Sequence, residues 1–344
     1  MKRIITLLIW MICARILVAQ DVHFSQFNAS ALIQNPALAG ASTPLEATIN
    51  YRSQWKSITI PYKTSAASFH MRLIKKKNQK NYFGMGLNFF NDHSGDGQLV
   101  TNMVNYSLAF HVQLHKFHHL GLGLQAGYGQ RRIDTQDFQW GSQYESTGFN
   151  PGISSGENYG SPAFGYLDIS GGLVWTFENK SIRMKVRGNS YSKGNAGISL
   201  YHFNRPNYSF NGTGEKLMMK YVVHGNFLQS LGSSSVALNP GFMAYKQGPN
   251  TEFLIGSLIR YDFLSGSKYS NNLENLGASI GAYWRMGDAL VVSSLFEFGV
   301  WNFGISYDAN MSNLRQASSG RGGFEISIGY NLGLTHYSRS VRMI

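Results

Sequence analysis

The residue types that could support catalysis or metal binding are present in this sequence, but their spacing is unfavourable. Three histidines, His115, His118 and His119, are close enough to bind a metal, yet they fall at a short turn between two strand-like segments, where a solvated hairpin explains them better. Serine, histidine and acidic residues that could form a hydrolase triad are scattered along the chain. We therefore expect no enzymatic activity, no metal site and no cofactor.

Four charged residues, Arg52, Arg285, Asp308 and Glu325, have the spacing of a buried charged network instead. Each shares the pleat parity of the small, polar face of its segment, so none would face lipid, where a central charge costs roughly 2–4 kcal/mol. The first and last strands of a closed barrel are neighbours, so we expect Arg52 and Glu325 to form an ion pair in the lumen, with the other two nearby. Separate solvation by lumen water is the alternative. If the pair is direct, Glu325→Lys should impair assembly and adding Arg52→Glu should partly restore it.

The segments that must position these charges alternate apolar residues with small or polar ones, the period-two pattern of a transmembrane strand. The longest example covers residues 104–114, where apolar residues at even positions alternate with Asn, Ser, Ala, His and Gln. Gly121, Gly123 and Gly127 fall on the small face of another such segment, and we interpret them as strand glycines because no helix pattern follows. The pattern predicts an all-β fold, an antiparallel transmembrane β-barrel.

Such segments recur along the chain and predict about fourteen strands, an even number as in other bacterial barrels. The expected spans are 45–55, 64–74, 82–91, 99–114, 119–132, 164–177, 195–204, 218–229, 235–246, 251–263, 274–286, 288–299, 301–309 and 323–334. An even count should place both chain ends on one side, which we expect to be the periplasm. The segments 133–163 and 205–217 are then outer loops, whereas 178–194 and 264–273 are longer than periplasmic turns usually are.

Aromatic residues near the expected strand ends fit the interfacial girdles of such a barrel. They are Trp55, Tyr82, Trp175, Trp284 and Trp301. A soluble β-sandwich would also alternate, but its solvent-facing side should be rich in Lys, Glu and Thr. Here that side is largely Gly, Ser and Asn, which suits a crowded lumen and favours the barrel.

The start of the chain has the layout of a cleavable secretory signal over residues 1–19, with a basic start, an apolar run over 4–12 and a small residue at Ala19. The residues before Cys13 are not the small ones that lipid attachment favours. Because Cys13 is the only cysteine, the cleaved chain should have no disulfide. The net charge is +12, and the only dense run of basic residues is at 75–77, in an expected hairpin turn. This distribution argues against nucleic-acid binding and suits anionic lipid headgroups.

Residues 20–44 precede the first expected strand and contain turn-forming residues at Asn35-Pro36 and Ala39-Gly40. We expect a short irregular or helical segment against the inner mouth of the barrel, which is assigned residues 45–334. The segment would plug the lumen or present a surface to a periplasmic partner. A simple tether is the alternative.

This N-terminal tract also carries a spacing of aromatic, amide and turn residues that belongs to one family. The residues are Phe24, Gln26, Phe27, Asn35, Pro36 and Gly40. Together with Tyr-Arg-Ser-Gln-Trp at 51–55 and the later motifs at 281–285, 304–308 and 322–327, the tract resembles the PorP/SprF family, outer-membrane proteins of the type IX secretion system of Bacteroidetes. Residues 335–344 extend past the last expected strand, whereas many bacterial barrels end at an aromatic residue.

The resemblance implies a barrel that acts through protein contacts in secretion or in surface delivery of a cargo protein, such as an adhesin for gliding motility. The implied partners are outer-membrane lipid and either periplasmic secretion proteins similar to PorE, PorK and PorN or the C-terminal domain of a secreted adhesin, with no nucleic acid. A passive or fatty-acid-type solute transport barrel is the alternative, because a lumen lined with Gly, Ser, Asn and Gln could pass solute.

Overall fold

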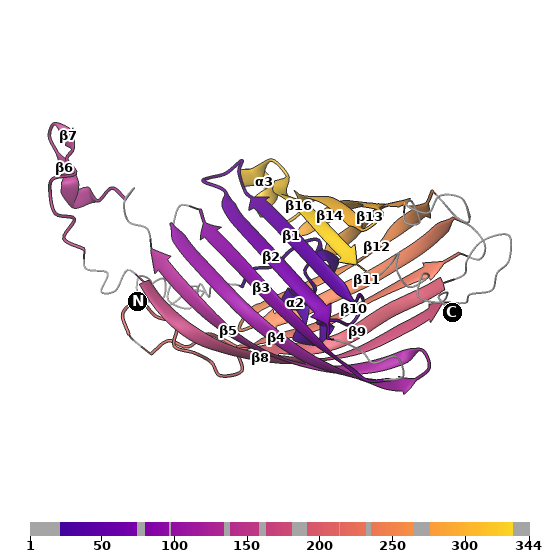
Figure 1. The fold of residues 1–344 in the computed structure, drawn as a ribbon. Coiled ribbons are helices and arrows are strands. Elements are labelled where there is room, and N and C mark those ends of the chain that lie inside the picture. The colour runs from indigo at the N-terminus through magenta and orange to yellow at the C-terminus, as the bar shows by residue number, and fades with distance from the viewer. Residues whose placement is uncertain are drawn as a thin grey trace, which may run out of the picture.

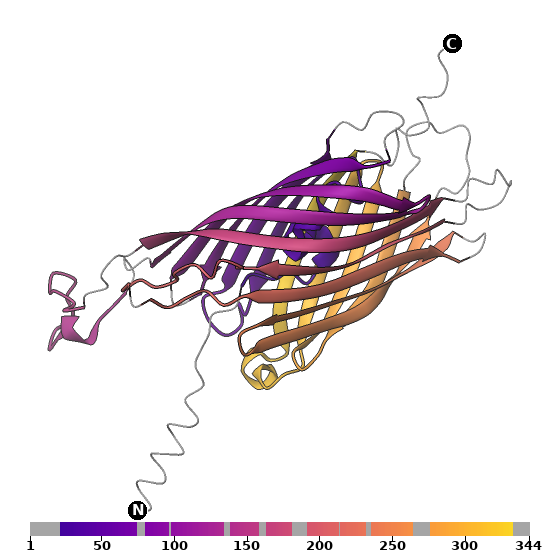
Figure 2. The same cartoon turned by 90° about the horizontal axis from the view of Figure 1, so that it is seen from below.

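A closed antiparallel β-barrel makes up most of the protein (Figures 1 and 2). The computed structural model describes residues 21–73, 80–95, 98–133, 138–157, 163–180, 191–212, 214–231, 235–263 and 276–332. Outside the barrel, β6 (Tyr144–Glu145) and β7 (Gly148–Phe149) form a small hairpin beside the 3₁₀ helix η3 (Gly141–Gln143). The predicted fold class is confirmed.

Fourteen strands close the barrel, and each pairs with its neighbour along the chain. They are β1 (Leu45–Gln54), β2 (Tyr62–Arg72), β3 (Tyr82–Ser94), β4 (Leu99–His115), β5 (His118–Ile133), β8 (Ala163–Lys180), β9 (Tyr191–Tyr201), β10 (Lys220–Ser230), β11 (Val236–Gln247), β12 (Asn250–Asp262), β13 (Leu276–Arg285), β14 (Ala289–Phe298), β15 (Trp301–Asn310) and β16 (Arg321–Leu332). The seam between β1 and β16 runs in register from Leu45 opposite Leu332 to Gln54 opposite Gly323. Every expected span overlaps one strand, with its ends within four residues.

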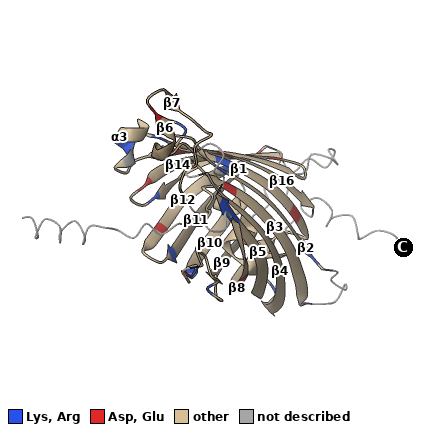
Figure 3. Cartoon of the chain, turned by 90° about the vertical axis from the view of Figure 1, so that its left-hand side faces the viewer, with Lys and Arg blue, Asp and Glu red and all other residues tan. Residues whose placement is uncertain are grey.

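The alternation in sequence becomes an outer apolar face and an inner polar face. In β4 the side chains of Val104 and Leu108 are exposed, whereas Asn105 and Ser107 are buried against the lumen contents. Few strand positions carry charged residues, so the strands are tan over most of their length in Figure 3. An exposed apolar belt on the outside is the surface that lipid requires.

The barrel has two mouths that differ in their connections. The loop mouth, where β1 ends, carries the connections 55–61, 95–98, 134–162, 202–219, 248–249, 286–288 and 311–320, the last of which contains α3 (Leu314–Ser318). The turn mouth, where β1 begins and β16 ends, carries 73–81, 116–117, 181–190, 231–235, 263–275 and 299–300. No helix among the described residues is long and apolar enough to cross a membrane.

Three very short helices lie inside the barrel, visible between the strands in Figure 2. They are η1 (Phe27–Ala29), α2 (Ala31–Gln34) and η2 (Pro36–Leu38). The break between α2 and η2 follows from local chemistry, because Asn35 is extended and its side chain accepts from the amide of Ala37, while Pro36 starts the next turn. Residues 21–43, which contain these helices, are called the lumen segment below.

A lumen segment anchored to the barrel wall

The lumen segment crosses the barrel from one mouth to the other. Asp21 contacts residues at the loop mouth, where β9 ends and β10 begins. Gly40 lies at the turn mouth, where its carbonyl accepts a hydrogen bond from Arg72 at the end of β2. The expectation that both chain ends lie on one side concerns residues outside the described part of the chain, which begins with Asp21 at the loop mouth and ends with Leu332 at the turn mouth. An even number of strands places the start of β1 and the end of β16 at the same mouth. The lumen segment precedes β1 and runs through the barrel from the opposite mouth.

At the loop mouth a set of polar side chains holds the start of the lumen segment. The Asp21 carboxylate lies 2.6 Å from Nε2 of His202 and 3.7 Å from Nζ of Lys220. The other ring nitrogen of His202 lies 2.9 Å from the Asp168 carboxylate. Gln247 donates from Nε2 to Asp21 at 3.1 Å. We call these five residues the mouth latch.

The mouth latch holds its charges by mutual attraction. Burial disfavours the charged ring of His202, but the carboxylates of Asp21 and Asp168 outweigh burial and raise the pKa of His202 to about 9. Burial likewise disfavours the Asp21 carboxylate, but His202 and Lys220 outweigh it and hold the pKa of Asp21 below its ordinary value. The latch is thus charged on both sides at neutral pH.

We expect the start of the lumen segment to loosen at high pH. The folded pKa of His202 lies above its free value of about 6.5, so its stabilising contribution is complete below about pH 6.5 and is lost as the pH rises through about 9. Asp21 contributes above about pH 4 and loses its contribution as the pH falls through its depressed pKa. A spin label at Val22→Cys should gain mobility across the upper range. His202→Gln should abolish that pH dependence, and a parent label unaffected by pH contradicts the latch.

Across the seam between β1 and β16, the lumen segment binds a carboxylate through its backbone. Glu325 of β16 accepts from the amide of Ser25 at 2.8 Å and from the amide of Gln26 at 3.0 Å. The side chain of Gln26 donates to the Glu325 carbonyl at 3.2 Å and accepts from Ser327 Oγ at 2.7 Å. The last strand therefore holds the segment by both its side chains and its backbone.

A second carboxylate, Asp308 of β15, joins the segment to two arginines. Its Oδ2 lies 3.0 Å from Nη2 of Arg52 and 2.9 Å from Nη1 of Arg285. Ser25 donates from Oγ to the same oxygen at 2.8 Å and accepts from Arg285 at 2.6 Å. Arg52 also donates to the carbonyl of His23 at 2.5 Å. We call Ser25, Gln26, Arg52, Arg285, Asp308 and Glu325 the seam anchor.

All four charged residues expected in the lumen lie together in the seam anchor, each at most 3% exposed. The expected direct pair takes another form. Arg52 and Glu325 are opposite each other in the register, yet Arg52 pairs with Asp308 while both Glu325 oxygens receive amides of the lumen segment. The sequence could not supply this arrangement, because it depends on backbone groups of a segment about 300 positions away.

Further along the lumen segment, the family-motif residues pack into the barrel wall. Phe27 meets the ring of Tyr283 edge-on, with centroids 5.3 Å apart. Asn35 is fully buried and donates to the carbonyls of Leu173 and Ile198 at 2.9 and 3.1 Å. These contacts reach β8, β9 and β13, so the segment ties together strands on several sides of the lumen.

Glycines of the wall make room for the lumen segment, a role that sequence reasoning missed. A Cβ at Gly123 would lie 2.5 Å from Cα of Ala37, and a Cβ at Gly84 would collide with the carbonyl group of Ala39. A Cβ at Gly40, which has φ +66°, would lie 3.1 Å from Cα of Gly84. The available signal was the run of glycines on the inward face of β3 and β5, which marks close backbone approach.

The aromatic residues expected in girdles lie in three different places. Trp175 and Trp301 near the turn mouth and Trp284 near the loop mouth are 41%, 45% and 51% exposed on the outer face. Trp55 is half-buried in the turn after β1, where its ring meets Tyr62. The expectation for Tyr82 is wrong, because its side chain points into the lumen and is 5% exposed. Its ring stacks on that of His111, with the centroids 4.6 Å apart. Its parity is that of Gly84 on the inner face.

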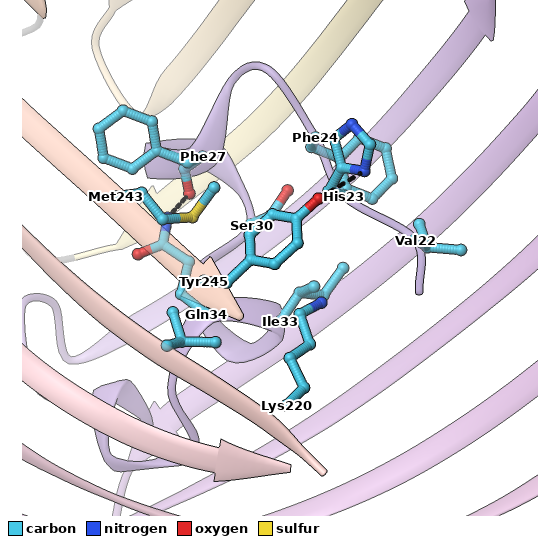
Figure 4. Close-up of a pocket in the computed structure, with 11 residues that line it drawn as sticks. Val22, His23, Phe24, Phe27, Ser30, Ile33, Gln34, Lys220, Met243 and Tyr245 are labelled. Carbon is cyan, nitrogen blue, oxygen red and sulfur yellow. Dashed lines mark hydrogen bonds between the residues drawn. The ribbon is translucent and has the colours of Figure 1, made fainter. Parts of the chain in front are cut away.

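A small pocket remains between the lumen segment and the wall (Figure 4). Lys220 and Tyr245 come from β10 and β11. The Tyr245 hydroxyl lies 3.4 Å from Nδ1 of His23 and donates to the Glu252 carboxylate at 3.0 Å. The other lining residues are Val22, Phe24, Phe27, Ser30, Ile33, Gln34, Val222 and Met243. Among the described residues there is no group of three His, Cys, Asp or Glu side chains that could hold a metal. His118 instead stacks on Trp175.

This chain matches solved structures of other proteins at low sequence identity and low TM-score. The CymD monoaromatic hydrocarbon channel is 10% identical with a TM-score of 0.43, over 90% of this chain and 94% of that chain. The P. putida toluene transporter TodX is 11% identical with a TM-score of 0.42, over 89% and 94%. BamA from Haemophilus ducreyi, lacking POTRA domains 1–3, is 10% identical with a TM-score of 0.42, over 84% and 70%. No curated protein matches the chain.

A family model gives a much more specific match. The model described as type IX secretion system membrane protein PorP/SprF matches residues 16–330. That range includes the lumen segment, the mouth latch, the seam anchor and all of the barrel except the last two residues of β16. The chain therefore belongs to the PorP/SprF family of type IX secretion system membrane proteins.

Proposed function

We propose that this protein is an outer-membrane component of the type IX secretion system that acts by protein contacts and not by passing cargo through its own lumen. The observation that carries the proposal is the lumen segment, which spans the barrel from the mouth latch to Gly40 and is bonded to the wall along its course. A folded protein or an extended chain would have to displace it. The working surfaces are then the two mouths.

The finer proposal concerns what those mouths contact. The turn mouth suits periplasmic secretion proteins similar to PorE, PorK and PorN, and the two longest connections, both at the loop mouth, suit the C-terminal domain of a secreted adhesin. In the loop-mouth connection, residues 138–157 fold on themselves, with the Gln143 side chain donating to the Ile153 carbonyl at 2.9 Å. Tyr144 and Phe149 remain exposed there. Such ordered aromatic residues are typical of protein-binding loops.

The test is the surface and supernatant proteome of a strain lacking this gene, compared with its parent and with a complemented strain. We expect loss of exported proteins. Loss of many of them identifies a core component, and loss of one adhesin identifies a dedicated delivery partner. An unchanged proteome refutes the secretion role and favours the passive or fatty-acid-type transport barrel, which reconstituted protein would then reveal as solute uptake.

A further inference from the structure

The path of the lumen segment fixes the relation between the two ends of the described chain. Asp21 sits at the loop mouth, within hydrogen-bond distance of His202 just after β9 and of Gln247 at the end of β11. The segment then descends past the seam anchor, and Ala41 reaches the turn mouth, where its carbonyl accepts from Arg72. Leu45 begins β1 there, opposite Leu332 at the end of β16. The start of the segment and the end of the barrel thus lie at opposite mouths.

The lengths of the connections indicate which mouth faces outward. Bacterial barrels have short periplasmic turns and long extracellular loops. The two longest connections, 134–162 and 202–219, are both at the loop mouth, whereas the longest connection at the turn mouth is 263–275. The loop mouth is therefore assigned to the cell exterior.

The external connections also form a surface around the start of the lumen segment. Within 202–219, Tyr208 donates its amide to the Glu215 carbonyl at 2.7 Å and forms a hairpin. The Tyr208 ring packs edge-on against Tyr166 of β8 at 5.3 Å, and Leu217 joins the same buried cluster with Met103. The mouth latch lies at the base of this hairpin, since His202 and Lys220 flank it in the chain.

We infer that the protein presents the N-terminal end of its lumen segment, at Asp21, to the cell exterior, while the end of β16 faces the periplasm. The outer surface then consists of the long connections and the Asp21 end of the lumen segment together. An external partner can reach the lumen segment directly at Asp21. A periplasmic partner can reach only its other end, near Gly40. This inference rests on the outer-membrane part of the proposed function and not on any secretion activity.

Single-cysteine variants test the inference, because Cys13 lies in the expected leader and no other cysteine is present. One variant carries a cysteine inserted between Gln20 and Asp21. Ser142→Cys, an exposed residue of the 134–162 connection, is the loop-mouth control, and Lys116→Cys, in the turn between β4 and β5, is the turn-mouth control. Intact and permeabilised cells are treated with a membrane-impermeant maleimide, and each variant is purified to quantify labelling.

We expect the inserted cysteine to be labelled in intact cells to the same extent as Ser142→Cys, with Lys116→Cys labelled only after permeabilisation. Labelling of the insertion only with the turn-mouth control overturns the threaded path. Labelling of the insertion and Ser142→Cys only after permeabilisation overturns the outward assignment. Neither readout depends on cargo export, so a failed secretion proposal and a failed topology proposal give different results.

Discussion

A Glu325→Lys variant should release the lumen segment and fail to form a stable barrel. The change removes both oxygens that accept from the amides of Ser25 and Gln26, and it places a new positive charge opposite Arg52. Breaking one side of a buried charged network costs on the order of 3–5 kcal/mol, a large part of the stability of a typical domain of about 5–15 kcal/mol. Loss of the heat-resistant folded band on gels, together with proteolysis within residues 21–43, would show it.

Two further variants distinguish the seam anchor from a direct ion pair between Arg52 and Glu325. Glu325→Gln keeps a side-chain carbonyl that can accept from one amide, so an intermediate loss of protection is expected. Adding Arg52→Glu to the lysine variant should not restore folding, because Arg52 serves Asp308 and the His23 carbonyl, and the new carboxylate would face Asp308. Recovery in the double variant would instead support direct pairing of Arg52 with Glu325. Full protection in the lysine variant would refute the anchor.

The second large effect is expected at a wall glycine. Gly123→Val places side-chain atoms where the backbone of Ala37 now runs, with Ala37 Cα 2.5 Å from the added Cβ. Backbone atoms of Pro36 and Ala37 fill this space, so the segment must leave the wall. Overpacking of this kind costs about 1–3 kcal/mol or more. We expect the barrel to remain assembled but to conduct ions in planar bilayers, where the parent should not.

The matched control for this variant lies on the opposite face of the neighbouring strand. In Gly171→Val the added Cβ has its nearest atoms at 3.5 Å, an ordinary contact distance. Conductance and protease protection should therefore match those of the parent. If Gly123→Val also remains silent in bilayers, the lumen segment does not close the barrel.

The sequence alone was sufficient for the strands. Alternation over 104–114 and its equivalents is a local property, so it places each strand and the side that each residue faces without knowledge of the others. The same parity put Arg52, Arg285, Asp308 and Glu325 inside the barrel. Where parity was set aside in favour of position near a strand end, as for Tyr82, the interpretation failed, since Tyr82 faces the lumen with Gly84.

The tertiary structure decided what fills the lumen and how it is held. Residues 21–43 carry too little periodicity to predict their path, and their partners are distant in sequence, as with Ser25 and Glu325 or Asp21 and His202. Strand parity fixes which face a side chain takes, whereas only the closed curvature of the barrel brings β9, β15 and β16 around one segment. The local pattern therefore determined the barrel, and the long-range contacts determined the plug and its direction.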